Sequence, residues 1–340
     1  MDFRPNPCLI TGACKPGGGA LSSMNIVMLT ENDPAGMGIA FTHAINRYTD
    51  HRCRLVSCQE RYGINFEKDI YAPDIKDDNG FQTLDGILKD ADIFHFHILS
   101  DETMSFGSLR VKDYIKGKKI IHHHHGHPEF RANPDSFCAK YRDLGRKMLV
   151  STPDLHRMAP ESTWIPNIVP LDHPLFMPAQ TRRNGKVKIC QAPTRKDLKN
   201  TDDFIHVTDR LKLRLPQIER VIIEQTQYQD CLNEKKTCHI HFDHMQGYYG
   251  VSSLESLSQG KPVIAGLDDW NTKYIKRFTG RDSLPWCIAK NREELEKTIE
   301  NLVMDPYLCD DLGKQSRDFM VNVWNEKRVL DILFQVYSTL

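Results

Sequence analysis

Two cations that follow an apolar segment are the first residues whose types and spacing suggest chemistry. Val187 to Gln191 is an apolar run of strand length, and Arg195 and Lys199 come shortly after it. Positive charges behind the carboxyl end of a strand suit a diphosphate leaving group, because negative charge develops on its bridging oxygen as the bond breaks. Lys196 lies between them and fits a solvated surface as well as it fits a ligand. The two cations are therefore candidates for binding a diphosphate.

The stretch around which the chain is organised runs from His239 to Ala265. A short strand with alternating apolar residues leads into a loop that carries Gly247 and Gly250, and a short helix follows. Strand, loop, helix and strand make one unit of a parallel α/β sheet. We expect a strand over 238–242, a helix that starts near Val251 and stops at Gly260, and a buried strand at 263–264.

The loop and helix of this unit have the features of an anion site. Glycines let the backbone approach a ligand closely, and the free amides of the helix start near Val251 are suited to an anion. Glu255 lies about one turn into the helix and points towards whatever the loop holds. Any doubly wound domain contains such units, so the glycine loop by itself does not decide between a binding site and a structural turn.

The complete string is more specific than its glycines. Gly247, Tyr249 and Gly250 are followed after four residues by Glu255, and after four more by Gly260-Lys-Pro-Val. This pattern resembles the nucleotide-sugar signature of the retaining family-4 glycosyltransferases. Gly247 stands where the first Glu of the family's acidic pair usually stands. The sequence is more similar to a subgroup with Asp-Gln-x-x-x-Gly-x-Tyr-Gly, which is represented here by Asp243, His244, Gly247, Tyr249 and Gly250.

This resemblance implies the GT-B fold, in which two Rossmann-like α/β domains face a cleft. It also assigns roles within the second domain. Glu255 would hold the ribose hydroxyls of a nucleoside-diphosphate sugar, and Lys199 and Arg195 would hold its diphosphate. Tyr249, Gly250 and the helix start at Val251 would present backbone amides to the donor.

The first half of the chain opens with a similar strand, loop and helix. A strand over 25–29 precedes Asp33-Pro-Ala-Gly-Met-Gly, and a helix follows from about Ile39 to Tyr48. Gly-x-Gly alone is not a dinucleotide fingerprint. In the family that the chain resembles, the matching loop closes over the donor, which places the amides of Gly36 and Gly38 near the transferred sugar.

Histidines cluster in two strands of the first half. His95 and His97 share one face of the strand over 92–97, where they are either packed and hydrogen-bonded or close to a ligand at the carboxyl end of the strand. Residues 118–121 begin another strand that continues into five histidines between His122 and His127. Strand alternation places His122 and His124 on one face and His123 and His125 on the other. These four residues are therefore a poor set of ligands for a tetrahedral metal ion, and we expect no metal. The resemblance places His97 and His125 at the donor, with the imidazole of His125 on a sugar hydroxyl.

The expected organisation is two domains with a terminal segment at each end. Residues 1–23 are rich in Gly, Pro and small side chains and are predicted to be a flexible extension. Residues 24–175 are the expected acceptor-side domain, and residues 176–325 the nucleotide-sugar domain. Several prolines and a basic stretch place the linker near 172–185. In the GT-B fold the last helix, residues 326–340, packs back towards the first domain.

Bulk composition limits the class of protein. The 340 residues hold 45 Lys plus Arg and 45 Asp plus Glu, so the chain has no general attraction to nucleic acid or anionic lipid. Ten cysteines occur singly, which favours reduced thiols. No apolar run approaches the ~20 residues of a membrane span, and residues 1–22 lack the apolar core of a secretory signal. We expect a cytoplasmic protein, with association at a membrane surface left open.

The function that the sequence favours is retaining transfer of a sugar from a nucleoside-diphosphate sugar, without a metal or other cofactor. The acceptor is unknown and could be a glycan, a lipid-linked molecule or a small molecule. One alternative is a phage-type enzyme acting on modified DNA bases, for which lysines between 112 and 119 offer a local basic patch that the neutral overall charge does not support. Another is a GT-B-like nucleotide-sugar-binding protein without turnover, because the first Glu of the usual pair is absent.

Overall fold

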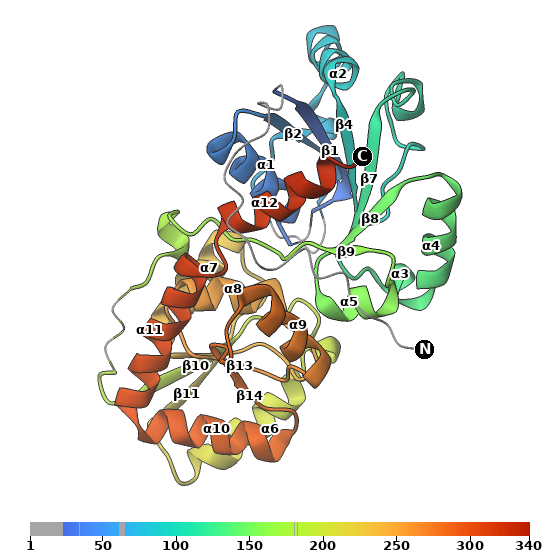
Figure 1. The fold of residues 1–340 in the computed structure, drawn as a ribbon. Coiled ribbons are helices and arrows are strands. Elements are labelled where there is room, and N and C mark those ends of the chain that lie inside the picture. Colours follow the sequence, from blue (N-terminus) through green and yellow to red (C-terminus); the bar gives the residue numbers. More distant parts are fainter. Residues whose placement is uncertain (1–22, 34, 61–64, 180, 182) are drawn as a thin grey trace, which may run out of the picture.

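The fold consists of two α/β domains, one above the other in Figure 1. The computed structural model describes residues 23–33, 35–60, 65–179, 181 and 183–340. Almost all of the predicted N-terminal extension, residues 1–22, lies outside the described residues. Below, the first domain is the seven-stranded sheet with its helices, and the second domain is the five-stranded sheet with its helices.

The sheet of the first domain is parallel throughout its described strands. Its central strands are buried on both sides because helices cover both faces, which explains their near-continuous apolar sequences. A two-stranded antiparallel ribbon of β5 (Ser105–Phe106) and β6 (Leu109–Arg110) lies outside this sheet. In spatial order the sheet contains β3 (Ile70–Tyr71), β2 (Arg52–Gln59), β1 (Asn25–Asn32), β4 (Ile93–His97), β7 (Lys119–His124), β8 (Lys147–Val150) and β9 (Thr163–Trp164).

Five α-helices of the described chain accompany this sheet before the crossing to the second domain. The first of them begins after Asp33, whose carboxylate accepts hydrogen bonds from the amides of Gly38 (3.1 Å) and Ile39 (3.0 Å). The helices are α1 (Met37–Tyr48), α2 (Asp78–Asp90), α3 (Pro128–Ala132), α4 (Pro134–Asp143) and α5 (Pro153–Met158), with 3₁₀ turns η2 (Ala72–Asp74) and η3 (Val111–Asp113).

The second domain repeats the parallel design with shorter strands. The strand order is β11 (Ile218–Ile222), β10 (Val187–Gln191), β12 (Ile240–Phe242), β13 (Val263–Ala265) and β14 (Trp286–Ile288). Its helices are α6 (Thr201–Lys212), α7 (Tyr228–Thr237), α8 (Val251–Ser258), α9 (Asp269–Thr279), α10 (Arg292–Met304) and α11 (Pro306–Asn322), with 3₁₀ turns η4 (Pro174–Phe176) and η5 (Lys196–Leu198).

The last helix, α12 (Glu326–Tyr337), returns to the first domain, as the red ribbon in Figure 1 shows. Asn325 caps it by accepting a hydrogen bond from the amide of Arg328. Its apolar face, with Val329, Leu330 and Leu333, is part of the same buried cluster as strands β1, β2 and β4. The chain therefore crosses between the domains twice, once before β10 and once before α12.

The structure confirms the predicted α/β class and most elements, with two corrections. The polar sequence of residues 60–79 predicts a loop, but the segment contains β3 and η2, because β3 pairs with β2 over two residues. The apolar residues from Val221 predict a strand over 221–224, which the structure places at Ile218–Ile222, since the buried Ile218 starts its pairing with β10. No described helix is long and apolar enough to cross a membrane.

Candidate active site

A cavity of about 820 Å³ lies between the two domains, at the carboxyl ends of the strands of both sheets. The first domain contributes loops that follow β1, β7 and β8, and the second contributes loops that follow β10, β11 and β12. This is where ligands bind in open parallel α/β sheets. Six of the ten predicted site residues line the cavity: His125, Lys199, Tyr249, Gly250, Val251 and Glu255.

The start of helix α8 is open towards this cavity. Gly250 precedes the helix and has no side chain to cap it, and the first turn contains no acidic residue. Val251 and Ser252 also line the cavity. The amides and dipole of an uncapped helix start favour negative charge, so this helix start has the features on which the predicted anion site depends.

Lys199 is held beside this helix start by a buried carboxylate. Its Nζ lies 3.1 Å from Oδ1 of Asp243. The other oxygen of this carboxylate, Oδ2, accepts hydrogen bonds from the Gly250 amide (2.6 Å) and from Ser253 Oγ (2.7 Å). Burial opposes the charge of Asp243, but His244, Lys199 and the hydrogen bond from Ser253 hold the pKa of this carboxyl well below its usual range. A fixed carboxylate thus positions both the amine and the loop.

Gly250 leaves room for the same arrangement. A Cβ at this position would lie 2.9 Å from Nζ of Lys199 and 3.1 Å from Oδ1 of Asp243, so a larger residue would displace the amine from its place beside the carboxylate. Its φ of −93° is open to any residue, so the constraint comes from packing and not from backbone conformation. Gly247 differs, because its φ of +90° lies in the region that favours glycine.

Glu255 is a buried group, which excludes the alternative of an exposed helix residue. Its relative exposure is 6%, and Oε1 accepts a hydrogen bond from the Tyr228 hydroxyl at 2.9 Å. Oε2 lies 2.5 Å from Nζ of Lys235, which also donates to Ser252 Oγ. Burial opposes the charge of Lys235, but the neighbouring Glu255 raises the pKa of the amine above its ordinary value. Each carboxylate oxygen keeps acceptor capacity for a ligand.

Tyr228 and Lys235 are functional candidates that sequence reasoning missed. Both line the cavity, and with Leu232 they occupy one face of α7 at helical spacing. A lysine at a position whose helical neighbours are buried is the signal that could have found them. Phe66 of the first domain packs against Tyr228, with ring centroids 4.5 Å apart, so both domains contribute to this wall.

His125 lines the cavity from the first domain. Its Nε2 is 2.9 Å from Nδ1 of His97, and the two rings are stacked. Burial lowers the pKa of His125 to about 4, so it is a neutral imidazole near pH 7. His97 itself lies behind His125 and does not line the cavity. His95 is packed, and its Nδ1 is hydrogen-bonded to the Tyr337 hydroxyl. Both histidines therefore match the packed and hydrogen-bonded alternative.

Three further predicted residues also lie off the cavity wall. Arg195 pairs with Asp197 across η5, where its side chain is half exposed. Gly36 adopts a φ of +64° before α1, against the ring of Phe66. The amide of Gly38 is bonded to Asp33, while its neighbours Ala35 and Met37 reach the cavity. Their donor-binding roles stay predictions.

Tyr249 lines the cavity and also packs at the junction of the domains. Its ring is buried against Trp286 and Trp324, and its hydroxyl lies 3.5 Å from the carbonyl of Ser151 in the first domain. The use of its backbone amide by a donor stays a prediction.

Several solved structures share this architecture at low sequence identity. HepE of Anabaena, solved with UDP and glucose, aligns with a TM-score of 0.63 and 10% identity over 93% of this chain and 100% of that chain. A glycosyltransferase of Rickettsia africae aligns with a TM-score of 0.54 and 14% identity over 94% of this chain and 99% of that chain. An alpha-glucosyltransferase, solved with UDP and a 13-mer DNA containing a central A:G mismatch, aligns with a TM-score of 0.58 and 10% identity over 93% of this chain and 100% of that chain. Neither a protein-family model nor a curated protein sequence matches the chain.

These likenesses establish the fold of the chain. It is the GT-B fold, with two Rossmann-like domains facing a cleft, as the sequence predicted. Structural similarity at such low sequence identity establishes the fold but not the chemistry, so function has to be argued from the cavity.

Proposed function

We propose that this protein is a retaining glycosyltransferase of the family-4 type, which moves a sugar from a nucleoside-diphosphate sugar to an acceptor. The observation that carries the proposal is the second-domain wall of the cavity. There the uncapped start of α8 and the amine of Lys199 lie together, and Glu255 lies one turn further along the helix. These groups match a diphosphate followed by a ribose. Solved structures of the same fold contain UDP or UDP-glucose, which supports this assignment for the second domain.

In this proposal Lys199 and the α8 amides stabilise the charge that develops on the departing diphosphate. Glu255 accepts hydrogen bonds from the ribose hydroxyls, because a carboxylate beside the phosphates would repel them. His125 bonds a sugar hydroxyl as a neutral imidazole. With an amine and helix amides available, binding of the diphosphate needs no Mg²⁺ or Mn²⁺.

The carboxylates of the cavity argue for front-face attack with retention. Within the described lining these are Glu224 and Glu255, both in the second domain, and each is paired with a lysine. Neither is placed as a nucleophile on the opposite side of the sugar. The departing phosphate oxygen then receives the proton of the acceptor hydroxyl as the new glycosidic bond forms.

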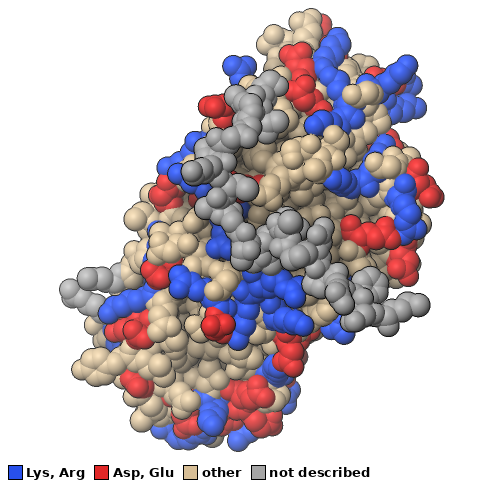
Figure 2. All heavy atoms as spheres, viewed as in Figure 1, with Lys and Arg blue, Asp and Glu red and all other residues tan. Residues whose placement is uncertain are grey.

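The acceptor class is the less determined part of the proposal, and we favour a glycan, lipid-linked or small-molecule acceptor over DNA. One solved structure of this fold contains DNA. Figure 2 shows Lys and Arg gathered across the middle of the visible face and mixed with Asp and Glu elsewhere, but the net charge of the chain is zero. Binding to a phosphate backbone requires a concentrated excess of cations. A salt-sensitive shift of a DNA duplex in a gel would support the DNA alternative.

A screen of nucleoside diphosphates and their sugars by thermal shift tests the donor site directly. A ligand at about 100 times its Kd adds about 2.7 kcal/mol to the stability of the folded protein. Stabilisation by one nucleoside diphosphate and its sugars is the expected result. Release of nucleoside diphosphate from the stabilising donor then separates an enzyme from a binding protein without turnover, which releases none. Retention is checked by the anomeric configuration of the product.

A further inference from the structure

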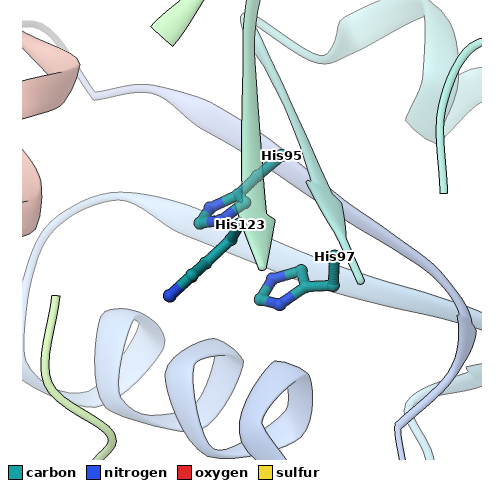
Figure 3. A group of neighbouring side chains, drawn as sticks. All are labelled: His95, His97 and His123. Carbon is teal, nitrogen blue, oxygen red and sulfur yellow. The ribbon is translucent and has the colours of Figure 1, made fainter. Parts of the chain in front are cut away.

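Three histidines of two neighbouring strands converge on one face of the first sheet (Figure 3). His95 and His97 are two residues apart on β4, so they project to the same side. His123 of β7 is the register partner of His97 and lies on that side too. One nitrogen atom of each ring lies within 4.8 Å of the others. The alternation predicted for residues 122–125 is correct, but the neighbouring strand supplies the ligands that β7 alone lacks.

The nitrogen atoms of this histidine triad are buried and short of partners. In the part of the chain that the structure describes, Nε2 of His95, Nε2 of His97 and both nitrogens of His123 make no hydrogen bond. All three side chains are 1% exposed or less. An unpaired polar atom in a core is costly, and each such atom calls for a ligand.

The remaining ring nitrogens of His95 and His97 are held by outer groups. Nδ1 of His95 lies 2.6 Å from the Tyr337 hydroxyl, and Nδ1 of His97 lies 2.9 Å from Nε2 of His125. Histidines that bind metals have this arrangement, in which one nitrogen is bonded to an outer partner and the other faces the ion. The outer contacts fix the ring positions and leave both Nε2 atoms for coordination.

We propose that His95, His97 and His123 bind one divalent transition-metal ion, for which Zn²⁺ is the best match. Three neutral imidazoles with a further open position form a known zinc ligand set, whereas Mg²⁺ and Ca²⁺ require oxygen ligands. Zinc–nitrogen bonds of about 2.1 Å bring tetrahedral ligands to about 3.4 Å from one another, so the rings turn towards the ion as it binds. This site is separate from the diphosphate site and does not depend on the proposed transfer reaction.

Metal binding here would fix the tautomer of a residue that lines the cavity. With the ion on Nε2, neutral His97 carries its proton on Nδ1 and donates it to Nε2 of His125. Neutral His125 then has its own proton on Nδ1. The ion thus sets which nitrogen of His125 is a donor, without touching a ligand in the cavity.

Titration of the full-length chain with Co²⁺, after dialysis against a chelator, tests the site. We expect one ion per chain, with the visible absorption bands of a four-coordinate cobalt site, and displacement of the ion by Zn²⁺. Absence of these bands in the wild-type protein overturns the proposal.

Variants on the two faces of the same strands provide the matched comparison. His97→Gln and His123→Gln should abolish the bands, whereas His122→Gln and His124→Gln should keep them, because those side chains pack on the opposite face against Tyr141. Bands that persist in both His97→Gln and His123→Gln contradict the assigned ligands. Tyr337→Phe keeps the ligands and removes only one outer partner, so it should weaken Co²⁺ binding about 10- to 100-fold in a folded protein. Unchanged affinity in this variant also counts against the triad.

Discussion

The two sides of the cavity hold their polar groups in opposite ways. The second-domain side is built from paired charges, with Asp243 against Lys199 and Glu255 against Lys235. The first-domain side presents His125, a neutral imidazole that is stacked on other buried imidazoles. One side can therefore meet a charged ligand group with little rearrangement, and the other offers hydrogen bonds without net charge.

The difference suggests a division of labour between the domains. Paired charges that are fixed in advance stabilise an anion without paying for reorganisation at the moment of reaction. The cation of Arg131 on the first-domain wall is paired with Asp154, so this wall carries little net charge where the sugar and the acceptor must meet. Each prediction below tests whether the two sides differ in this way.

The largest effect is expected from removing Lys199, the cation that Asp243 positions on the charged side. Lys199→Ala should lower the rate of transfer by roughly ten- to a thousandfold, the range for a lost electrostatic donor. Initial rates at saturating donor measure this effect. Lys297→Ala, which removes an exposed lysine of α10, is the control and should leave the rate unchanged. Equal rates for Lys199→Ala and wild type would contradict the proposed role of this amine at the diphosphate.

The next effect concerns stability on the charged side. Asp243→Asn removes a buried charge from Lys199 and should lower the free energy of unfolding by about 3 kcal/mol at neutral pH. Folding lowers the pKa of Asp243, so its contribution is complete above the ordinary value of 3.8 and is lost as the pH falls below it. Urea unfolding from neutral to acidic pH should show the gap between wild type and variant closing.

A gap that stays constant as the pH falls would show that Asp243 carries no special charge in the folded protein. Asp331→Asn on the exposed face of α12 is the matched control and should show no gap at any pH.

A smaller effect is expected at the Glu255 cluster. Glu255→Gln should weaken free nucleoside diphosphate and full donor equally, by about 1.5 to 3 kcal/mol, because charged hydrogen bonds to the ribose are lost. Tyr228→Phe should weaken the binding of both ligands by about 1 kcal/mol, because Glu255 loses the hydrogen bond that positions one of its carboxylate oxygens. Calorimetric titration of both ligands measures these changes.

Glutamine is preferred over alanine at position 255, because alanine would leave the buried Lys235 without a partner. Loss of donor binding with unchanged affinity for the free diphosphate would move Glu255 from the ribose to the sugar.

No effect is expected from adding a divalent cation at the proposed diphosphate site. Adding Mg²⁺ or Mn²⁺ to protein treated with a chelator should leave the transfer rate unchanged, because Lys199 and the α8 amides already neutralise the diphosphate. Activity that appears only with Mn²⁺ would contradict the proposal that Lys199 and the α8 amides are sufficient to neutralise the diphosphate. Zn²⁺ is supplied equally in every arm, so that the histidine triad is in the same state throughout the comparison.

Local sequence signals were sufficient for the charged side. Gly250, Val251, Glu255 and Lys199 were found because a glycine loop, a helix start and a cation after a strand follow rules of short range. Their partners were found less well. Lys235 belongs to a different helix from Glu255, and only the packing of α7 on α8 brings the amine to the carboxylate.

The histidine side shows the same limit more clearly. The spacing within each strand indicated which face each ring occupies, and the faces are as expected. The sequence did not indicate that β4 and β7 are neighbours in register, because pairing between strands is a property of the whole sheet. Similarly, Gly38 has the residue type of a ligand-binding glycine, while its amide is bonded to Asp33.

The return of α12 to the first domain has a consequence for how the protein is made. Chain synthesis proceeds from the N-terminus, and a domain usually begins to fold as it emerges. Here Met28, Phe41 and Ile93 pack in one cluster with Leu333 and Tyr337, which are translated after the second domain. Of the two domains, the one that is translated first is therefore the last to complete its core. Part of its apolar surface stays uncovered until the second domain has been synthesised.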